Sequence, residues 1–230
     1  MLTKFIDNAC EDSLTAAVFT HLLHLPSEVF WQILRNACHT TSLPEYAGEP
    51  RSVEFWPKWN PNKTRNASYV EPDVFIRFNI FDLIIEAKRE DEGQQYRQQW
   101  ENEVTAYDNE YGHENVPVRM IALGGIWDTK DDEVPVRMSV CPVHMCRWST
   151  LLLECQRLKR ELEEENKHAP TSRISADIRI LNNLCAFFAA HGYAALRWFE
   201  DFDFKSNLPS PSVDSDQQYF RNISLQFQAS

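Results

Sequence analysis

Two apolar segments joined by a very short connection constrain the fold of this chain most. Val70–Phe78 and Phe81–Lys88 have the length and composition of β-strands, and only Asn79 and Ile80 lie between them. Strands this close in sequence pair as an antiparallel hairpin, although Asn-Ile is a poor version of the favoured two-residue turns. The sequence therefore predicts a hairpin with a defined register.

This register places acidic residues face to face. A turn centred between the two connecting residues puts Asp73 opposite Glu86 and Arg77 opposite Asp82. Directly opposed side chains have Cβ atoms about 4.5–5.5 Å apart, so the first pair brings two carboxylates into repulsive contact. A divalent cation between them would turn repulsion into coordination, because Mg²⁺ prefers oxygen ligands. We interpret the second pair as a cross-strand ion pair without a chemical role.

A lysine joins the two acids. Lys88 follows Glu86 by two residues, and the period of two along a strand puts both side chains on one face. Ala87 points to the other face, but its carbonyl is available to a metal ion. A lysine beside a cation and a phosphate can orient water or stabilise developing charge.

The remaining pattern indicates an α/β or α+β domain with a mixed sheet. Periodicity predicts a further strand on each side of a long polar helix, two helices before the hairpin and two after the last strand. The helices are expected at Asn8–Leu25, Ser27–Ala37 (with Ser27 as its cap), Glu92–Tyr111, Trp148–Lys167 and Ile174–Gly192, and the further strands at Ser52–Trp56 and Val116–Ile126. We expect a core over 1–147 and a helical extension with a tail over 148–230, packed on that core.

Glu11 lies on the apolar stripe of the first helix, three residues before Leu14. A carboxylate that faces a core is costly unless it has a partner. Asn8-x-x-Glu11 also fits a capping box, in which the carboxylate bonds the first backbone amides of its own helix. Both interpretations remain open from the residues alone.

Pro72-Asp73, twelve intervening residues and then Glu86-Ala87-Lys88 resemble the motif of the PD-(D/E)XK nuclease superfamily, which has the restriction-endonuclease-like fold. The family core runs helix, three strands, helix, strand, and the expected elements have that order from Asn8 to Trp127. The resemblance covers about half of the chain. The hairpin context and the acid on the first helix support the resemblance.

The resemblance implies a Mg²⁺-dependent (or Mn²⁺-dependent) deoxyribonuclease of prokaryotic antiviral defence or restriction. Asp73 and Glu86 would hold the metal with the Ala87 carbonyl, Glu11 would bind a second ion or a water beside it, and Lys88 would orient the attacking water. The family also places a glutamine or tyrosine on the helix after the lysine. Candidates at four-residue steps along that helix are Gln95, Gln99, Glu103 and Tyr107; the first two are expected to lie near DNA, and the sequence does not choose between them.

A basic and aromatic segment is a candidate for binding nucleic acid. Residues 55–66 contain Lys58, Lys63 and Arg65 with two tryptophans and no acid. Such a loop can contact phosphates and stack on bases. An equally weighted alternative is a surface loop whose tryptophans pack on the core. The net charge of -11 argues against a protein that coats nucleic acid non-specifically, but it leaves a local basic patch possible.

Several other classes are disfavoured. The six glycines form neither a GxGxxG nor a GxxxxGK[ST] pattern, and GxSxG and HExxH are missing. No apolar run of about 18 residues predicts a membrane span, and the first residues do not resemble a secretion signal, so we expect a cytoplasmic protein. The expected partners are DNA, other protein subunits or a second copy. Two alternatives remain: a non-catalytic scaffold with the same fold, and a zinc protein using Cys141, His144 and Cys146.

Overall fold

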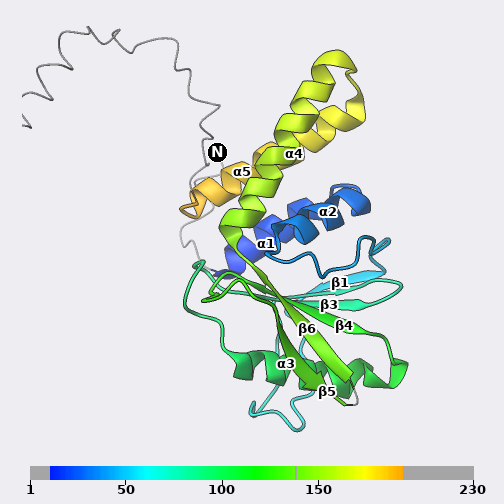
Figure 1. The fold of residues 1–230 in the computed structure, drawn as a ribbon, viewed down its shortest axis with the longest axis vertical. Helices are drawn as coiled ribbons and strands as arrows, with labels where there is room; N and C mark the ends of the chain where they lie inside the picture. Colours follow the sequence, from blue (N-terminus) through cyan, green and yellow to red (C-terminus); the bar gives the residue numbers. More distant parts are fainter. Residues whose placement is uncertain (1–10, 138, 194–230) are drawn as a thin grey trace, which may run out of the picture. The chain divides into compact units, whose positions relative to one another are not determined.

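The structure is a computed structural model that describes residues 11–137 and 139–193. Figure 1 shows helices and strands in a mixed α/β arrangement. In chain order the elements are α1 (Glu11–Leu22), α2 (Ser27–Ala37), β1 (Ser52–Phe55), β2 (Val74–Arg77), β3 (Asp82–Ala87), α3 (Arg97–Tyr111), a 3-10 turn (Gly112–Glu114), β4 (Val118–Leu123), β5 (Asp132–Val136), β6 (Ser139–Cys146), α4 (Trp148–His168) and α5 (Ser172–Ala190).

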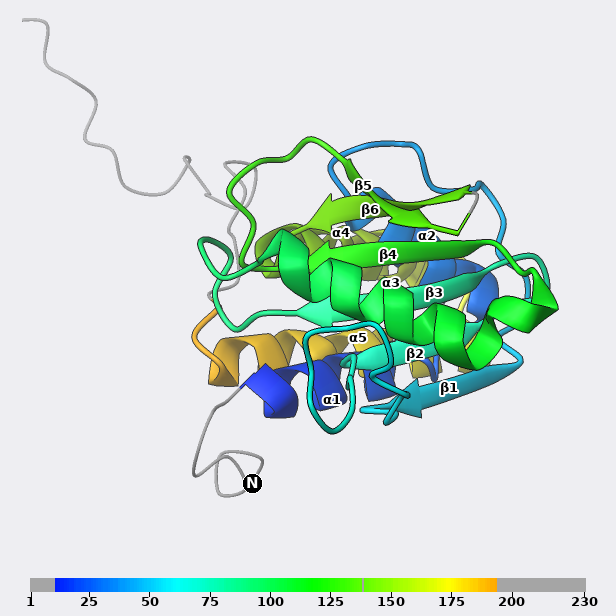
Figure 2. The ribbon, with the colours of Figure 1, turned by 90° about the horizontal axis from the view of Figure 1, so that it is seen from below.

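The described strands form one mixed sheet in the order β1-β2-β3-β4-β6-β5. The pairs β1–β2, β2–β3 and β5–β6 are antiparallel, whereas β3–β4 and β4–β6 are parallel. Helix α3 is the crossover that connects the parallel strands β3 and β4, and Figure 2 shows it lying across the sheet. The carboxyl ends of β3, β4 and β6 therefore lie at the same end of the sheet.

Helices cover both faces of this sheet. On one face, residues of α1, α2, α4 and α5 form a single apolar cluster with the sheet. On the other face, α3 and the segment that contains Trp59 and Val70 form a second cluster, and Figure 1 shows α3 alone among the helices on that side. Every residue of β3 is buried because this central strand has neighbours in the sheet and packing on both faces.

The predicted hairpin register is confirmed. Val74 pairs with Ile85 and Arg77 with Asp82, and the Phe78 amide donates to the Phe81 carbonyl across the turn (3.0 Å). The expected α/β class with a mixed sheet is confirmed as well. The helix boundaries at Ser27 and Ala37 are correct, but Ser27 is the first helical residue and not the cap, since Pro26 occupies that position and the Ser27 hydroxyl bonds Glu49.

Strands β5 and β6 were not predicted from the sequence. Prolines at positions 135 and 142 and a run of acids before them conceal the strand pattern of this segment. In the structure β5 is an edge strand, where proline is tolerated because no neighbour needs its amide hydrogen on the open side. β6 pairs with β4 through Val143, His144, Met145 and Cys146, beyond Pro142.

Helices α4 and α5 share the apolar cluster of α1 and α2, to which they contribute Leu151, Leu184 and Phe188. They belong to the same compact unit as the sheet. The predicted tail falls in residues 194–230, which lie outside the described residues. Among the described helices, none is long and apolar enough to cross a membrane.

The turn after β4 fixes the backbone that follows β3. Gly124 has a φ of +69°, and a Cβ at this position would lie 2.5 Å from the Lys88 carbonyl oxygen and 2.7 Å from that of Glu90. The Lys88 carbonyl also accepts a hydrogen bond from the Trp148 indole (2.6 Å). Glycine is required here because the two chain segments approach more closely than any side chain permits.

We predict that Gly124→Ala lowers the free energy of unfolding by about 2–5 kcal/mol. Alanine is strained at this positive φ, and its Cβ would displace the neighbouring backbone. Gly192 is a matched control, because it also has a positive φ (+92°) but a Cβ added there would meet nothing within 4 Å. Gly192→Ala should cost only about 1 kcal/mol. Urea unfolding of both variants checks this. Equal losses would mean that the contact at Gly124 is not tight.

Candidate functional site

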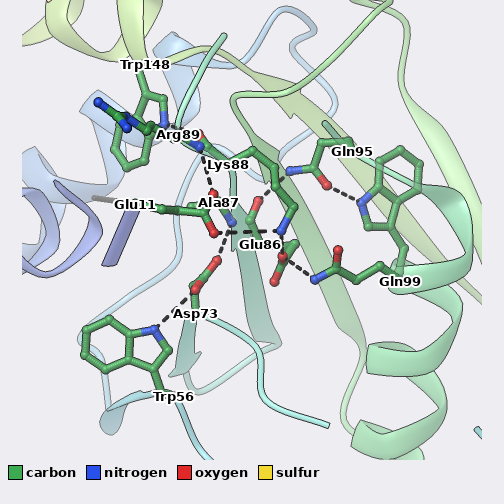
Figure 3. A network of polar contacts seen from close by, with 11 residues as sticks. Glu11, Trp56, Asp73, Glu86, Ala87, Lys88, Arg89, Gln95, Gln99 and Trp148 are labelled. Atoms are coloured by element: carbon green, nitrogen blue, oxygen red, sulfur yellow. Dashed lines mark hydrogen bonds and ion pairs between the residues drawn. The ribbon is translucent and has the colours of Figure 1, made fainter. Parts of the chain in front are cut away.

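Asp73 lies directly before β2, at the end of the hairpin remote from its turn. Its Oδ2 accepts a hydrogen bond from the Ala87 amide (2.7 Å), and its Oδ1 accepts one from the Trp56 indole (3.2 Å). The residue is only 6% exposed. Figure 3 shows its carboxylate pointing toward the ends of Glu86, Lys88 and Glu11.

Glu86 is the centre of the contacts on β3. It is 2% exposed, and its Oε1 accepts hydrogen bonds from the Lys88 ammonium and from the Gln99 amide. Its backbone carbonyl accepts one from the Gln95 amide (2.9 Å). The two glutamines that the sequence could not separate thus both hold Glu86, one through its main chain and one through its carboxylate. DNA contact by either glutamine stays a prediction.

Lys88 contacts two of the predicted acids. Besides its ion pair with Glu86, its Nζ lies 3.9 Å from Glu11 Oε1. Burial lowers the pKa of Lys88, but the adjacent carboxylates outweigh burial and hold that pKa above its ordinary value. Lys88 is therefore an ammonium ion at neutral pH, suited to stabilise negative charge and unsuited to accept a proton.

Glu11 reaches this site from the start of α1. Its Oε2 accepts a hydrogen bond from the Arg89 amide (2.9 Å), directly after Lys88 in the chain. The carboxylate thus bonds a different segment from its own helix, which supports the site interpretation. Asn8, the partner in the capping interpretation, lies outside the described residues.

Asp12, which was not predicted as a site residue, lies beside Glu11 and Asp73. Carboxylate oxygens of Glu11, Asp12 and Asp73 lie within 4.8 Å of one another, which suits a metal ion, although exposed acids also gather without one. Glu86 is not part of this triplet, so the predicted cation between Asp73 and Glu86 stays a prediction. Two consecutive acids at a helix start were the available signal, but they are also what a helix dipole favours.

The charges of the buried acids are incompletely balanced by the chain. Burial, followed by the charge of Glu86, raises the pKa of Asp73 to about 8. Burial also raises the pKa of Glu86, although Lys88 opposes this shift. A divalent cation would supply the missing positive charge, and the donors present are the oxygen ligands that Mg²⁺ prefers. The residues therefore fit the implied metal.

Asp82 shows that burial of an acid on β3 does not by itself make a site. It lies on the same face as Glu86, four residues earlier, and is fully buried. Its Oδ1 pairs with Arg77 (3.3 Å) and its Oδ2 accepts a hydrogen bond from Tyr107 (2.9 Å), so the predicted cross-strand ion pair is confirmed. Arg77 pairs with both Asp82 and Glu114, whereas Lys88 pairs with Glu86 and Glu11.

Some side chains of the predicted nucleic-acid loop pack on the core, and others are exposed. Trp59 is buried against Phe75, while Trp56 bonds Asp73 at the site. Lys58 lies 3.9 Å from Glu71 and over the ring of Tyr69. The other two predicted phosphate contacts, Lys63 and Arg65, are exposed. Trp59 thus packs on the core, as the alternative interpretation expected. Contact between the basic residues and DNA stays a prediction.

The zinc interpretation does not agree with the geometry. Cys141 lies in the apolar cluster under α3, whereas Cys146 lies in the cluster on the opposite face. His144 Nδ1 contacts Asp131 (2.9 Å) and Ser42 (3.0 Å). Alternation along β6 separates the thiols, and among the described residues the three donors do not converge on one point.

Half of this chain is similar to a known bacterial protein. The chain is 37% identical over 118 residues to an uncharacterized protein, PM0110, of Pasteurella multocida (strain Pm70); the match covers 50% of this chain and 43% of the relative. The chain thus matches less than half of that relative's length. No family model and no solved structure matches the chain.

Removal of the Asp73 carboxylate should change the pH dependence of stability. The pKa of Asp73 is about 8 in the folded protein, against about 3.9 for an unfolded chain. The metal-free protein should therefore lose stability as the pH rises from about 4 to 8, by up to a few kcal/mol. Asp73→Asn should flatten this slope, because asparagine does not ionise. Urea unfolding in EDTA at several pH values measures the slope.

Glu165→Gln, which alters an exposed acid on α4, is the control and should keep the parental slope. Mg²⁺ should stabilise the parent more at pH 8 than at pH 5, because the cation binds the ionised carboxylate. An unchanged slope in Asp73→Asn would show that Asp73 ionises normally in the folded protein.

Proposed function

We propose that this protein is a Mg²⁺-dependent nuclease of the PD-(D/E)XK type that hydrolyses DNA phosphodiester bonds, with a role in prokaryotic antiviral defence or restriction. The observation that carries the proposal is the convergence of Asp73, Glu86 and Lys88 at one end of a buried hairpin. The order α1, α2, β1, β2, β3, α3, β4 contains the order expected of a restriction-endonuclease-like core, with α2 added between α1 and β1.

The acids would hold the metal. Asp73, Glu11 and Asp12 offer carboxylate oxygens close together, and Glu86 and the Ala87 carbonyl lie on the adjacent strand. A bound Mg²⁺ would polarise the phosphodiester and make a nucleophile available at neutral pH. Mn²⁺ has the same preference for oxygen donors and is the natural substitute.

Lys88 would act on the phosphate as a fixed positive charge. Its ammonium is held by Glu86, which is itself held by Gln99 and Gln95. A preorganised charge aimed at a reacting phosphate lowers the energy of the transition state without reorganisation during the reaction. The same ammonium can orient a water by hydrogen bonding.

The substrate would approach through a local basic region. Lys58, Lys63 and Arg65 belong to the loop that also delivers Trp56 to Asp73. Phosphate contacts from such a loop position a nucleic acid without reading its sequence. The acidic balance of the whole chain would keep binding dependent on this loop and on bound cations.

We predict that Lys88→Ala lowers the single-turnover cleavage rate about 10²–10³-fold with Mg²⁺ present, because it removes a charge that stabilises the transition state. DNA affinity should change little, since one ammonium is a small part of a phosphate-contact surface. Cleavage of supercoiled, linear and single-stranded DNA measures the rate, and near-UV circular dichroism checks the fold.

Lys159→Ala is the matched control, because Lys159 lies on α4 and pairs with Glu163. It should cleave at the parental rate. Parental cleavage by Lys88→Ala would refute the mechanism. If the parent protein binds DNA or a protein subunit but cleaves none of the three substrates, the non-catalytic scaffold alternative replaces the nuclease.

A further inference from the structure

A cavity of about 350 Å³ opens beside Gln95, the residue whose side-chain amide donates to the Glu86 carbonyl (2.9 Å). Figure 3 shows this side chain directed toward Glu86. Trp100, Ile126 and Met145 give the cavity an apolar wall and are themselves buried. The cavity is therefore adjacent to the candidate site, although none of the proposed metal ligands lines it.

Trp127 lines this cavity with most of its surface in solvent. It is 77% exposed, more than any other large apolar residue in the part of the chain that the structure describes. Gly93 lies against its six-membered ring, because a Cβ added to Gly93 would be 3.0 Å from the ring atom Cζ2. Exposed apolar side chains are ordinary when they stand alone. Trp127 instead borders a cavity, so a flat ligand has both a ring to stack on and a space to occupy.

The turn that carries Trp127 is packed on the segment that carries Lys88. The Gln95 amide donates to the Gly125 carbonyl (2.9 Å), and a Cβ added to Gly125 would lie 2.8 Å from the Lys88 Cβ. Tyr96, which directly follows Gln95, is another exposed aromatic residue (66%). A nucleic acid strand bound at the acids would therefore pass next to the cavity and its exposed rings.

The polar side of the cavity suits a nucleobase better than a phosphate. Asp128, Asp131 and Asp132 line it, and carboxylates repel phosphates but accept hydrogen bonds from the amino groups of bases. Two of these carboxylates already have partners, since Asp132 pairs with Arg97 (2.6 Å) and Asp131 contacts His144 (2.9 Å). The cavity thus combines hydrogen-bond acceptors with an aromatic ring, as sites for unpaired bases do.

We propose that this cavity binds an unpaired nucleobase, stacked on Trp127, of the DNA strand that the acids would cleave. Lys130 also lines the cavity and would contact a phosphate of the same strand. A base inside a duplex is stacked and paired, so it can occupy the cavity only in single-stranded DNA or after extrusion from the helix. The inference rests on the proposed function and specifies its substrate, which is DNA with unpaired bases.

The test uses the full chain, Ca²⁺ in place of Mg²⁺, and a single-stranded oligonucleotide in which several bases are 2-aminopurine, whose fluorescence falls when it stacks. Binding to the parent should quench this fluorescence. Trp127→Ala should reduce the quenching and lower the affinity about 5- to 150-fold, which corresponds to the loss of one base–aromatic stack. Trp127→Phe keeps an aromatic ring and should retain most of the affinity and quenching.

Tyr46→Ala is the matched control. Tyr46 is also an exposed aromatic residue (60%), but it lies in the loop before β1, whose first residue pairs with Arg77 at the turn end of the hairpin. This variant should bind the single strand as the parent does. The fully paired duplex of the same sequence should bind more weakly to the parent and should not respond to Trp127→Ala. Near-UV circular dichroism verifies that every variant is folded.

A Trp127→Ala variant that binds and quenches the single strand as the parent does would overturn the base site. A parent that binds single-stranded DNA no more tightly than the duplex would overturn it as well.

Failure of this inference is distinguishable from failure of the nuclease proposal. A parent that binds single strands through Trp127 but cleaves no DNA with Mg²⁺ keeps the base site and refutes the nuclease. A parent that cleaves DNA, while Trp127→Ala binds the single strand normally, keeps the nuclease and refutes the base site.

Discussion

The close placement of two buried carboxylates, Asp73 and Glu86, is the interaction on which the rest of the site depends. Ionised acids in an apolar interior cost several kcal/mol each unless they are compensated. The chain supplies part of this compensation through the Ala87 amide, the Trp56 indole and the Lys88 ammonium. Burial and the charge of Glu86 outweigh these contacts and raise the pKa of Asp73 to about 8.

The scaffold explains why the acids remain in this unfavourable arrangement. β3 has a partner strand on each side and packing on both faces, so its residues have one conformation available. Helix α3 then contacts the polar face of β3 at four-residue intervals, with Gln99 and Glu103 at Glu86 and Tyr107 at Asp82. The turn after β4, at Gly124, packs against the backbone of Lys88 and fixes its position.

The sequence predicted the parts of the site that depend on local geometry. A two-residue connection fixes the hairpin register, and the register alone aligns Asp73, Glu86 and Lys88. The position of Glu11 on an apolar stripe was also informative, because a charge there requires a partner. The Arg77–Asp82 ion pair followed from the same register.

Features that depend on tertiary packing were not predictable in this way. Prolines conceal β5 and β6, whose strand character comes from pairing at the sheet edge. Asp12 resembles an ordinary helix-start acid until α1 is placed beside Asp73. Glu103 resembles any glutamate of a polar helix until α3 packs on β3, when burial and contact with Glu86 give it a different environment.

The most direct test of the central claim, that these acids form a cation site, is an anomalous difference map from crystals of the protein grown with Mn²⁺. We expect a peak at about 2.1–2.2 Å from a carboxylate oxygen of Asp73, at coordination distance for this class of ion. Crystals saturated with Mn²⁺ that show no peak beside Asp73, while its carboxylate keeps its contacts with Ala87 and Trp56, would contradict the account.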